Sequence, residues 1–461
     1  MKKSKVKIGL EIHVPLNTKS KLFCGCPTIA SKPNESTCEI CLGMPGSKPK
    51  LNKSVVNKAT KLALALNCSI QKTIIFSRKT YFYPDLCKNF QITQLSESLA
   101  INGFMDVKDK KIPIWRVQIE EDPGSLQHKE DYCLIDYNRS GTPLVEIVTG
   151  PEFENSEEVV EFLQKLTTIL DYLELYNPQN SSIRADVNVS ISNNNRVEIK
   201  NLSGSKAIEK AIDFEIMRQK IKLKKGEKIE QQTMHYDAES GTTFLSREKE
   251  SEEDYGYIFE PDLPILEFDK NFIKKIQADI PELPFQRFER FKKEYSLIEK
   301  EAYTITKEKA TADLFESLYK EIDKKYLKNW MVVSLRKVLN YNKVRFADTK
   351  IKEGQVKDLL KRILDKRLTP RSGEFVLREL VEKPNDIDKI IKKLGLGKIS
   401  EKEVEKIISN ILQKNKKAVK DYKEGKEKSL QFLIGQVIRK IKGRADAKEV
   451  TKLILKKIKS N

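Results

Sequence analysis

The stretch KIGLEIHVPLNTKSKLFCGC, residues 7–26, contains the strand around which we expect the N-terminal part of the chain to fold. In its first half, apolar side chains alternate with small or polar ones, which predicts a β-strand with one buried face. Because side chains repeat every two residues along a strand, Glu11 and His13 share the face opposite the apolar one. Two thiols, Cys24 and Cys26, follow the strand. The stretch therefore raises two candidate sites, one with a carboxylate and an imidazole and one with thiols.

The thiols belong to a four-cysteine pattern. Cys24 and Cys26 form Cys-x-Cys, an eleven-residue loop follows, and Cys38 and Cys41 form Cys-x₂-Cys. Four thiolates in two close pairs suit tetrahedral zinc, and a complete set of protein ligands is typical of a structural site. The alternative is four ordinary buried cysteines. The chain has seven cysteines, an odd number that does not indicate a disulfide framework.

Carboxylates also occur in strand-like segments where burial is costly. Glu120 and Glu121 end the alternating segment KIPIWRVQIEED, and Glu146 interrupts the apolar run PLVEIV. A buried carboxylate is unfavourable unless it is paired or binds a metal. Oxygen ligands from several strands suit Mg²⁺, which commonly accompanies a phosphate-bearing substrate. The alternative is a set of solvated charges on strand faces.

Two further segments carry polar groups suited to phosphate chemistry. SIRADVNVSI places Asp186, Asn188 and Ser190 on one strand face, and SRKTYFYPD places Arg78 and Lys79 before an aromatic cluster, as a candidate phosphate clamp. The sequence has no P-loop, no dinucleotide-binding fingerprint and no readable serine or cysteine nucleophile motif. Together the polar groups predict a nucleotide-dependent enzyme whose carboxylates lie on a sheet.

Charge divides the 461-residue chain into a neutral and a basic part. Residues 1–290 hold 41 basic and 42 acidic residues, whereas residues 291–461 hold 45 basic and 25 acidic ones. A basic C-terminal part indicates contact with a polyanion, although a lysine-rich proteome is the alternative explanation. The sequence has neither an apolar run of 18 residues nor a signal peptide, so we expect a cytoplasmic protein without membrane association.

The order of strand and helix patterns predicts an α+β fold with three domains. Up to residue 290, strand and helix patterns are interleaved without strict alternation, which favours a largely antiparallel sheet. SEEVVEFLQKLTTILDYLELY predicts a helix capped by Ser156. The Pro-rich segment 279–288 and the segment 392–400 are expected boundaries. The domains are a catalytic domain with the zinc loop 24–41, a helical domain and a basic helical tail, with the bounds 1–290, 291–395 and 396–461.

The tail, with 18 basic and 8 acidic residues in 401–461, predicts packed helices with cations outside. Phe432, Leu433 and Val437 are expected to pack inward. The cations expected outside, as candidate contacts to a polyanion, are Arg439, Lys440, Lys442 and Arg444.

Several long blocks of the chain resemble one protein family. The blocks are IGLEIHVPLNTKSKLFC, CLGMPGSKPKLN, RKTYFYPDL, QITQ, EEDPG, DYNRSGTPLVEIV, VEIKNLSG, EPDLP and the tail DYKEGKEKSLQFLIGQVIRKIKGRADAKEV. Nearly the whole chain in this order resembles the B subunit of the aspartyl/glutamyl-tRNA amidotransferases. The resemblance implies an N-terminal cradle domain whose chemistry is similar to that of glutamine synthetase, followed by helical and tail domains that hold tRNA.

The family resemblance also implies a reaction and partners. An amidase subunit releases ammonia, and the complex contains a third, small subunit. The B subunit uses ATP and Mg²⁺ to phosphorylate Glu on tRNA(Gln) or Asp on tRNA(Asn). Ammonia then displaces phosphate and gives Gln-tRNA(Gln) or Asn-tRNA(Asn). The alternative class is a non-catalytic, zinc-containing RNA-binding protein, which explains the cysteines and the basic half but not Glu146 in its apolar run.

Site roles follow residue by residue from the same resemblance. It implies a Mg²⁺ set of His13, Glu121 and Glu146, with Glu11 and Glu120 adjacent. Lys79 is expected to steady phosphate charge and Asp186 to bind metal or ammonium. The remaining phosphate or ATP candidates are Arg78, Asn188 and Ser190. One departure from the family is Cys87, which stands where the family has proline; a tolerated loop substitution and a redox role are the two interpretations.

Overall fold

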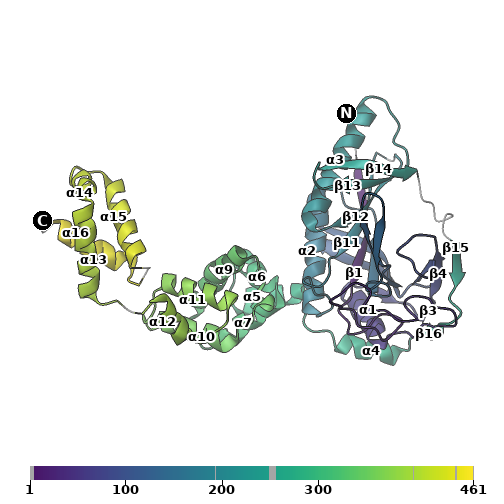
Figure 1. Cartoon of the computed structure of the whole chain (residues 1–461), viewed down its shortest axis with the longest axis horizontal. Helices are drawn as coiled ribbons and strands as arrows, with labels where there is room; N and C mark the ends of the chain where they lie inside the picture. Colours follow the sequence, from purple (N-terminus) through teal and green to yellow (C-terminus); the bar gives the residue numbers. More distant parts are fainter. Residues whose placement is uncertain (1–4, 193, 249–255, 398, 442–443, 460–461) are drawn as a thin grey trace. The chain divides into compact units, whose positions relative to one another are not determined.

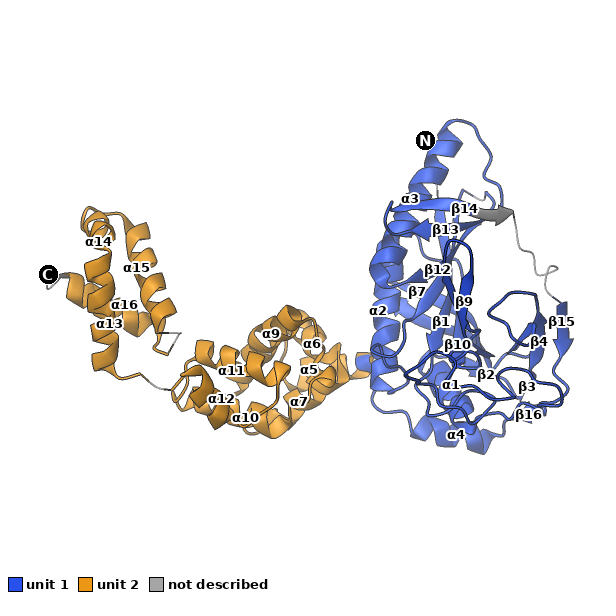
Figure 2. Ribbon diagram, viewed as in Figure 1, with its two compact units in different colours: residues 1–284 blue, residues 285–461 orange. Residues whose placement is uncertain are grey.

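The computed structural model describes residues 5–192, 194–248, 256–397, 399–441 and 444–459 (Figure 1). The chain forms two compact units, residues 1–284 and residues 285–461 (Figure 2). Each helix in the described ranges is too short or too polar to span a lipid bilayer.

Unit 1 is built on a nine-stranded sheet with the order β14-β13-β12-β11-β1-β10-β7-β6-β2. β12 and β13 run parallel and the other neighbouring pairs run antiparallel, so the sheet is mixed. The expected α+β class is confirmed, and the likeness to glutamine synthetase stays a prediction. The strands are β1 (Val6–Pro15), β2 (Ser69–Ile70), β6 (Ala100–Val107), β7 (Lys110–Glu121), β10 (Pro143–Thr149), β11 (Arg184–Ile191), β12 (Val197–Ser203), β13 (Gln232–Asp237) and β14 (Thr242–Glu248).

Three small sheets accompany the large one. The order in the three-stranded sheet is β15-β4-β5, and the other two sheets pair β16 with β3 and β8 with β9. Their strands are β3 (Thr73–Ile74), β4 (Ser77–Thr80), β5 (Phe90–Thr93), β8 (Ser125–His128), β9 (Cys133–Asp136), β15 (Gly256–Phe259) and β16 (Leu266–Glu267).

The central strand β1 separates the core of unit 1 from a polar face. Leu10, Ile12 and Val14 are at most 1% exposed and belong to one large hydrophobic cluster, as their alternation predicts. Three helices supply the other side of this cluster, and α3 packs on β11 and β12 (Figure 1). Glu11 and His13 therefore lie on the opposite face. The helices of unit 1 are α1 (Lys53–Ala65), α2 (Ser156–Tyr172), α3 (Ser205–Lys224) and α4 (Lys270–Ala278).

The N-terminus of α2 differs from its predicted form by one residue. Asn155 is the N-cap and its side chain accepts a hydrogen bond of 2.9 Å from the backbone N–H of Glu158. The predicted cap, Ser156, is the first helical residue, and its hydroxyl donates instead to Asp213 on α3. Since asparagine caps helices as well as serine does, the two adjacent candidates could not be separated by residue type alone.

Unit 2 is helical in all its described secondary structure, and its apolar residues form two clusters. One cluster draws on residues 291–396 and the other on residues 399–458, and the proposed division near residue 395 stays a prediction. The elements are α5 (Pro284–Glu294), α6 (Glu299–Thr306), α7 (Lys309–Tyr319), α8 (Lys324–Asn329), the π-helix η2 (Trp330–Leu335), α9 (Arg336–Asn342), the 3₁₀-helix η3 (Phe346–Asp348), α10 (Glu353–Leu364), α11 (Pro370–Glu382), α12 (Ile387–Leu394), α13 (Glu401–Lys414), α14 (Lys416–Lys423), α15 (Glu427–Lys440) and α16 (Ala447–Lys459).

Helix α15 follows the predicted inward pattern except at one position. Leu433 and Val437 are fully buried, four residues apart on one face. The prediction that Phe432 packs inward is wrong, because this side chain lies one residue away from the buried face and is 48% exposed. Arg439 and Lys440 are exposed at the end of the helix.

Candidate active site

His13, Glu120 and Glu146 meet on the polar face of the sheet, from three neighbouring strands. In the register of β1 and β10, His13 lies opposite Glu146. The Nε2 atom of His13 is 3.3 Å from Oε1 of Glu120, and one ligand atom from each of the three side chains lies within 4.8 Å of the others. Gln118 on β7 donates a hydrogen bond to Glu146. Two nearly buried carboxylates and an imidazole thus converge on one point.

A second acidic group lies beside the first. Glu11 pairs with Asp186 across β1 and β11, and Glu198 on β12 completes a group whose ligand atoms lie within 4.8 Å of one another. The amide of Asn188 donates to Glu11 over 3.2 Å. Lys200 forms ion pairs with Asp186 at 3.3 Å and with Glu198 at 2.9 Å. One ammonium therefore pairs with two of the three carboxylates.

The pKa values of these groups reveal a shortage of positive charge. Burial, followed by the charges of Glu146 and the other nearby carboxylates, raises the pKa of Glu11 to about 7. Burial also raises the pKa of Glu120 to about 7, even though His13 opposes the shift. Burial lowers the pKa of His13, but Glu120 and Glu146 outweigh it and the net shift is upward. Each shift indicates a place where an added cation is stabilising.

Both groups fit a hard divalent cation by their donor atoms. Glu11, Asp186 and Glu198 offer carboxylate oxygens alone, and His13 with Glu120 and Glu146 offers two carboxylates and one imidazole. Mg²⁺ takes six ligands, mostly oxygen, and usually keeps positions for water and substrate phosphate. Three protein ligands leave such positions open. The residues present therefore fit Mg²⁺ together with a phosphate-bearing substrate.

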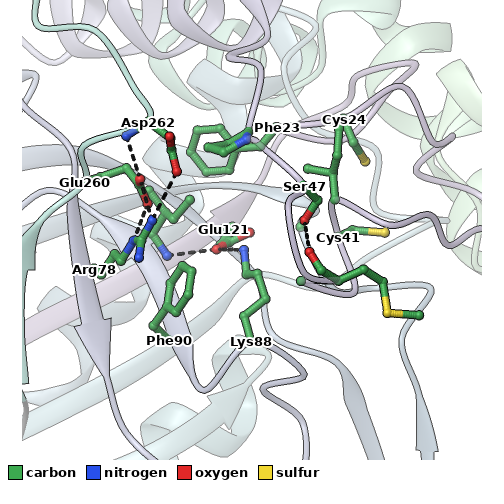
Figure 3. Close-up of a pocket in the computed structure, with 16 residues that line it drawn as sticks. Phe23, Cys24, Cys41, Ser47, Arg78, Lys88, Phe90, Glu121, Glu260 and Asp262 are labelled. Carbon is green, nitrogen blue, oxygen red and sulfur yellow. Dashed lines mark hydrogen bonds and ion pairs between the residues drawn. The ribbon is translucent and has the colours of Figure 1, made fainter.

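Glu121 lies apart from these groups, in a cavity of about 190 Å³ (Figure 3). Its carboxylate pairs with Lys88 and accepts a hydrogen bond of 2.8 Å from the backbone N–H of Ile92. Neighbouring residues of a strand point to opposite faces, so Glu120 faces His13 and Glu121 does not. The metal set implied by the family resemblance thus differs from the assembled set in one member: Glu120 stands in place of Glu121.

Arg78 lines the same cavity and is held by acidic partners. Its Nε and Nη2 atoms form hydrogen bonds with the two oxygens of Glu260, at 2.7 and 2.9 Å, and Asp262 lies 3.5 Å from Nη2 (Figure 3). The guanidinium also lies over the ring of Phe90, 4.6 Å from the ring centre. The predicted phosphate clamp at Arg78 is therefore already bound to the protein's own carboxylates.

The other predicted phosphate-binding side chains lie on two sheets: Asn188 and Ser190 on the nine-stranded sheet and Lys79 on the three-stranded one. Lys79 follows Arg78 on β4. Its positive charge opposes the upward shift of the pKa of Glu120, so Lys79 interacts electrostatically with the His13 group. On β11, Asn188 lies opposite Gly9 of β1 and next to Glu11, and Ser190 lies one period further along the strand. Asn188 thus contacts the Glu11 group directly, whereas Lys79 acts on the His13 group through its charge.

The four predicted cysteines lie together and fit zinc. One sulfur from each of Cys24, Cys26, Cys38 and Cys41 lies within 4.8 Å of the others, and the Sγ atoms of Cys38 and Cys41 are 3.9 Å apart. A Zn–S bond of about 2.3 Å places the corners of a tetrahedron about 3.8 Å apart. A hydrogen bond from Cys24 lowers the pKa of Cys41, and the ammonium of Lys21 lowers it further. Cys87 lies outside the group and contacts the carbonyl oxygen of Cys41, 3.0 Å from its sulfur.

Some site residues were missed in the sequence although a signal for them existed. The alternation in VEIK places Glu198 and Lys200 on one strand face, and the alternation of Gln118 with apolar residues places it on the same face as the predicted Glu120. Nothing local pointed to Glu260, because its partner Arg78 is 182 residues away in the chain.

The tail candidates are placed in part. Arg439 and Lys440 are exposed at the end of α15, and the Nε atom of Arg444 donates to the carbonyl of Ile441 over 3.1 Å. Lys442 lies outside the described residues. Whether these side chains bind tRNA stays a prediction.

Comparisons with known proteins show the family to which the chain belongs. Residues 6–274 match the model of the family "GatB/GatE catalytic domain", and residues 313–458 match the model of the family "GatB domain". Similar proteins that are named as the B subunit of aspartyl/glutamyl-tRNA(Asn/Gln) amidotransferase occur in Carboxydothermus hydrogenoformans, 38% identical over 99% of both chains, and in Halobacterium salinarum, 39% identical over 97% of this chain and 96% of the relative. A relative of the same name in Saccharolobus solfataricus is 39% identical over 98% of this chain and 99% of its own length. The chain therefore belongs to the B-subunit family of the aspartyl/glutamyl-tRNA amidotransferases.

Proposed function

We propose that this chain activates the side-chain carboxylate of Glu on tRNA(Gln), of Asp on tRNA(Asn), or of both, and converts it into an amide. In the first step the γ-phosphoryl group of ATP moves to the carboxylate and ADP leaves. In the second step ammonia attacks the acyl phosphate, phosphate leaves, and the nitrogen gives up a proton. A carboxylate is a poor acyl donor, so phosphorylation supplies the leaving group that amide formation requires.

The observation that carries this proposal is the pair of acidic groups on one sheet face. His13, Glu120 and Glu146 would hold one Mg²⁺, which when bound offsets negative charge on the transferring phosphoryl group. Glu11, Asp186 and Glu198 would hold a second cation, either a metal or the ammonium ion that supplies nitrogen. Lys79 contributes a fixed positive charge that acts on Glu120, and it steadies phosphate oxygens.

The names of the relatives support a multi-subunit amidotransferase that acts on tRNA, and the other partners in this proposal are those implied by the sequence resemblance. An amidase subunit supplies ammonia, and a third, small subunit joins the complex. The exposed cations Arg439 and Lys440 of α15 contact tRNA phosphates, since RNA outside its acceptor end is recognised mostly by shape and backbone. In the N-terminal loop, zinc bound by the four cysteines stabilises the fold next to β1.

The test is amidation by the reconstituted heterotrimer. Glu-tRNA(Gln) and Asp-tRNA(Asn) are supplied separately with ATP and Mg²⁺, and nitrogen comes from glutamine or, to bypass the amidase, from ammonium chloride. We expect ATP-dependent formation of the amide on at least one tRNA with either nitrogen source. A heterotrimer that hydrolyses glutamine and binds tRNA but amidates neither substrate overturns the proposal.

A further inference from the structure

Lys21 is a fully buried lysine whose amino group points into the cysteine site. Its side chain has 0% exposure, and its Nζ atom lies 3.5 Å from the Sγ atom of Cys41. The same nitrogen donates to the carbonyl oxygens of Ser36, at 2.8 Å, and Tyr137, at 3.4 Å. Lysine is almost never fully buried unless it is paired with an opposite charge. The burial of Lys21 therefore needs a negative partner.

Within the described ranges no carboxylate forms an ion pair with Lys21. Glu121 also lies near Gly141, which borders the side chain of Lys21, but the charge of Glu121 is taken up by Lys88. The two carbonyl oxygens carry only partial charge. Cys41 is thus the one neighbour hydrogen-bonded to the ammonium that becomes an anion when it binds a metal.

The cysteine loop itself holds Lys21 in place. Its backbone N–H donates to the carbonyl of Cys26 over 2.9 Å, and its own carbonyl accepts a hydrogen bond of 3.2 Å from the side chain of Asn52. The ammonium bridges Ser36, inside the loop, to Tyr137, outside it. The position of Lys21 is therefore fixed by the same segments that carry the thiols.

We propose that Lys21 is the counter-charge of the metal site, a positioning residue that acts through Cys41. Zinc with four thiolates carries a net charge of −2, which is costly to bury without compensation. An ammonium hydrogen-bonded to one thiolate offsets half of this charge, and the metal-bound thiolate in turn stabilises the buried ammonium. The inference rests on the proposed zinc site. It gives a role in metal binding to Lys21, which is not itself a zinc ligand.

The first experiment measures zinc affinity in the full-length chain. Wild type, Lys21→Met and Lys21→Gln are titrated with zinc in competition with a chromophoric chelator, and Lys19→Met, which removes an exposed lysine two residues away, is the matched control. Loss of a group that hydrogen-bonds a metal ligand typically weakens binding about 10- to 100-fold, and we expect this range for both Lys21 variants. The control is expected to bind zinc like the wild type.

The second experiment separates this role from simple packing. Thermal unfolding is compared with zinc bound and with zinc removed, and cobalt replaces zinc to record the thiolate-to-metal charge-transfer band. We expect Lys21→Met to lower the melting temperature of the zinc-bound chain more than that of the zinc-free chain, and to shift the cobalt band. Lys21→Gln retains donors for the two carbonyls, so its zinc affinity reports on the charge.

The outcomes distinguish the two proposals. A wild-type chain that binds no zinc overturns the zinc site. Lys21→Gln with wild-type zinc affinity and an unshifted cobalt band overturns the role of Lys21 alone. An equal loss of melting temperature with and without zinc, or failure of both variants to fold at saturating zinc, makes Lys21 a packing residue and also overturns it.

Discussion

The two units treat partly or fully buried glutamates differently. The pKa values of Glu11 and Glu120 in unit 1 are raised, whereas the pKa of Glu316 in unit 2 is lowered. Burial and neighbouring carboxylates raise the pKa of Glu11 to about 7, and burial raises that of Glu120 to about 7. Burial also favours a raised pKa at Glu316, but hydrogen bonds from Arg290 and Tyr295, together with Arg287, outweigh it and lower the pKa.

The two cases differ in the charges that surround the carboxylate. In unit 2 the protein supplies the cations, and Glu316 accepts hydrogen bonds from Arg290 at 2.7 Å and from Tyr295 at 2.9 Å. In unit 1, carboxylates are gathered with one another around His13 and Lys200. Structural carboxylates are paired within the fold, whereas a group of like charges is stabilised only by something that binds there.

The largest expected effect is on catalysis. Glu146→Gln removes one anionic ligand from the His13 group while keeping the shape of the side chain. Loss of an essential metal ligand is expected to lower the amidation rate about a thousandfold or more. The assay is amidation of Glu-tRNA(Gln) or Asp-tRNA(Asn) by the full heterotrimer, and glutamine hydrolysis by the amidase partner is the internal control. Near-normal amidation would show that Glu146 is not an essential metal ligand. The acidic groups of unit 1 would then not differ in function from the paired carboxylates of unit 2.

The second prediction concerns the four cysteines, which, like the acidic groups of unit 1, are expected to need a bound cation. Wild-type chain is expected to contain about one zinc, and Cys38→Ser is expected to lose zinc and to lower the melting temperature of unit 1 by about 5 °C or more, because zinc binding is part of the folding free energy. Elemental analysis and thermal unfolding measure both quantities on the same samples. Cys133→Ser, in the partly exposed strand β9, is the matched control. Full stability in zinc-free Cys38→Ser would count against a structural metal.

The third prediction concerns pH, where the two units should respond with opposite sign. Without Mg²⁺, Glu11 and Glu120 bind protons more tightly in the folded state, so the stability of unit 1 falls as pH rises from about 4.5 to 7, by up to about 3 kcal/mol for each group. The raised pKa of His13 acts in the same direction. Glu316, with its lowered pKa, contributes stability above its unfolded pKa that is lost as pH falls through its folded pKa.

The measurement is thermal unfolding of the full chain from pH 4 to 8, with and without saturating Mg²⁺. Metal binding stabilises the deprotonated carboxylates, so Mg²⁺ is expected to reduce the loss of unit 1 stability at higher pH. A pH profile that Mg²⁺ leaves unchanged would mean that the acidic groups do not bind it.

The fourth prediction removes the carboxylate that unit 2 has paired. Glu316→Gln leaves Arg287 and Arg290 short of negative charge and is expected to cost about 1–2 kcal/mol of unit 2 stability, with no direct effect on phosphorylation. Glu294→Gln removes a half-exposed partner of the same Arg290 and is expected to cost about 0.5 kcal/mol or less. Denaturant unfolding measures both. Equal effects of the two changes would show that burial does not distinguish these pairs.

The smallest expected effect is on the salt dependence of tRNA binding. Arg439→Gln combined with Lys440→Gln removes two exposed cations, and each lost phosphate contact should lower the slope of log affinity against log salt by about 0.7–0.9. Binding is measured across a salt series in the full heterotrimer. Lys224→Gln with Lys225→Gln, at the exposed end of α3, is the control. The same slope in both double variants would show that Arg439 and Lys440 make no specific contact with tRNA and that the basic tail reflects a lysine-rich composition.

Local sequence determined the parts of this protein that depend on short-range periodicity. The alternation around Glu11 and His13 defined a strand with one polar face, and two close cysteine pairs defined a four-thiol site. Helix α13 (Glu401–Lys414) begins and ends where its periodic apolar pattern does, because the apolar residues form the face that packs against the rest of the unit. These features depend on residues a few positions apart, so the sequence contains them completely.

The tertiary structure decided which groups share a site. Glu120 and Glu121 are adjacent in sequence, but the pairing of β7 with β10 places only Glu120 beside His13 and leaves Glu121 with Lys88. Arg78 carries the charge expected of a phosphate clamp, but it is bound to Glu260 from a distant segment. Lys21, an ordinary lysine in the sequence, is buried because the cysteine loop closes around it. Charge partners are chosen by proximity after folding, and proximity between distant segments is set by the packing of the whole unit.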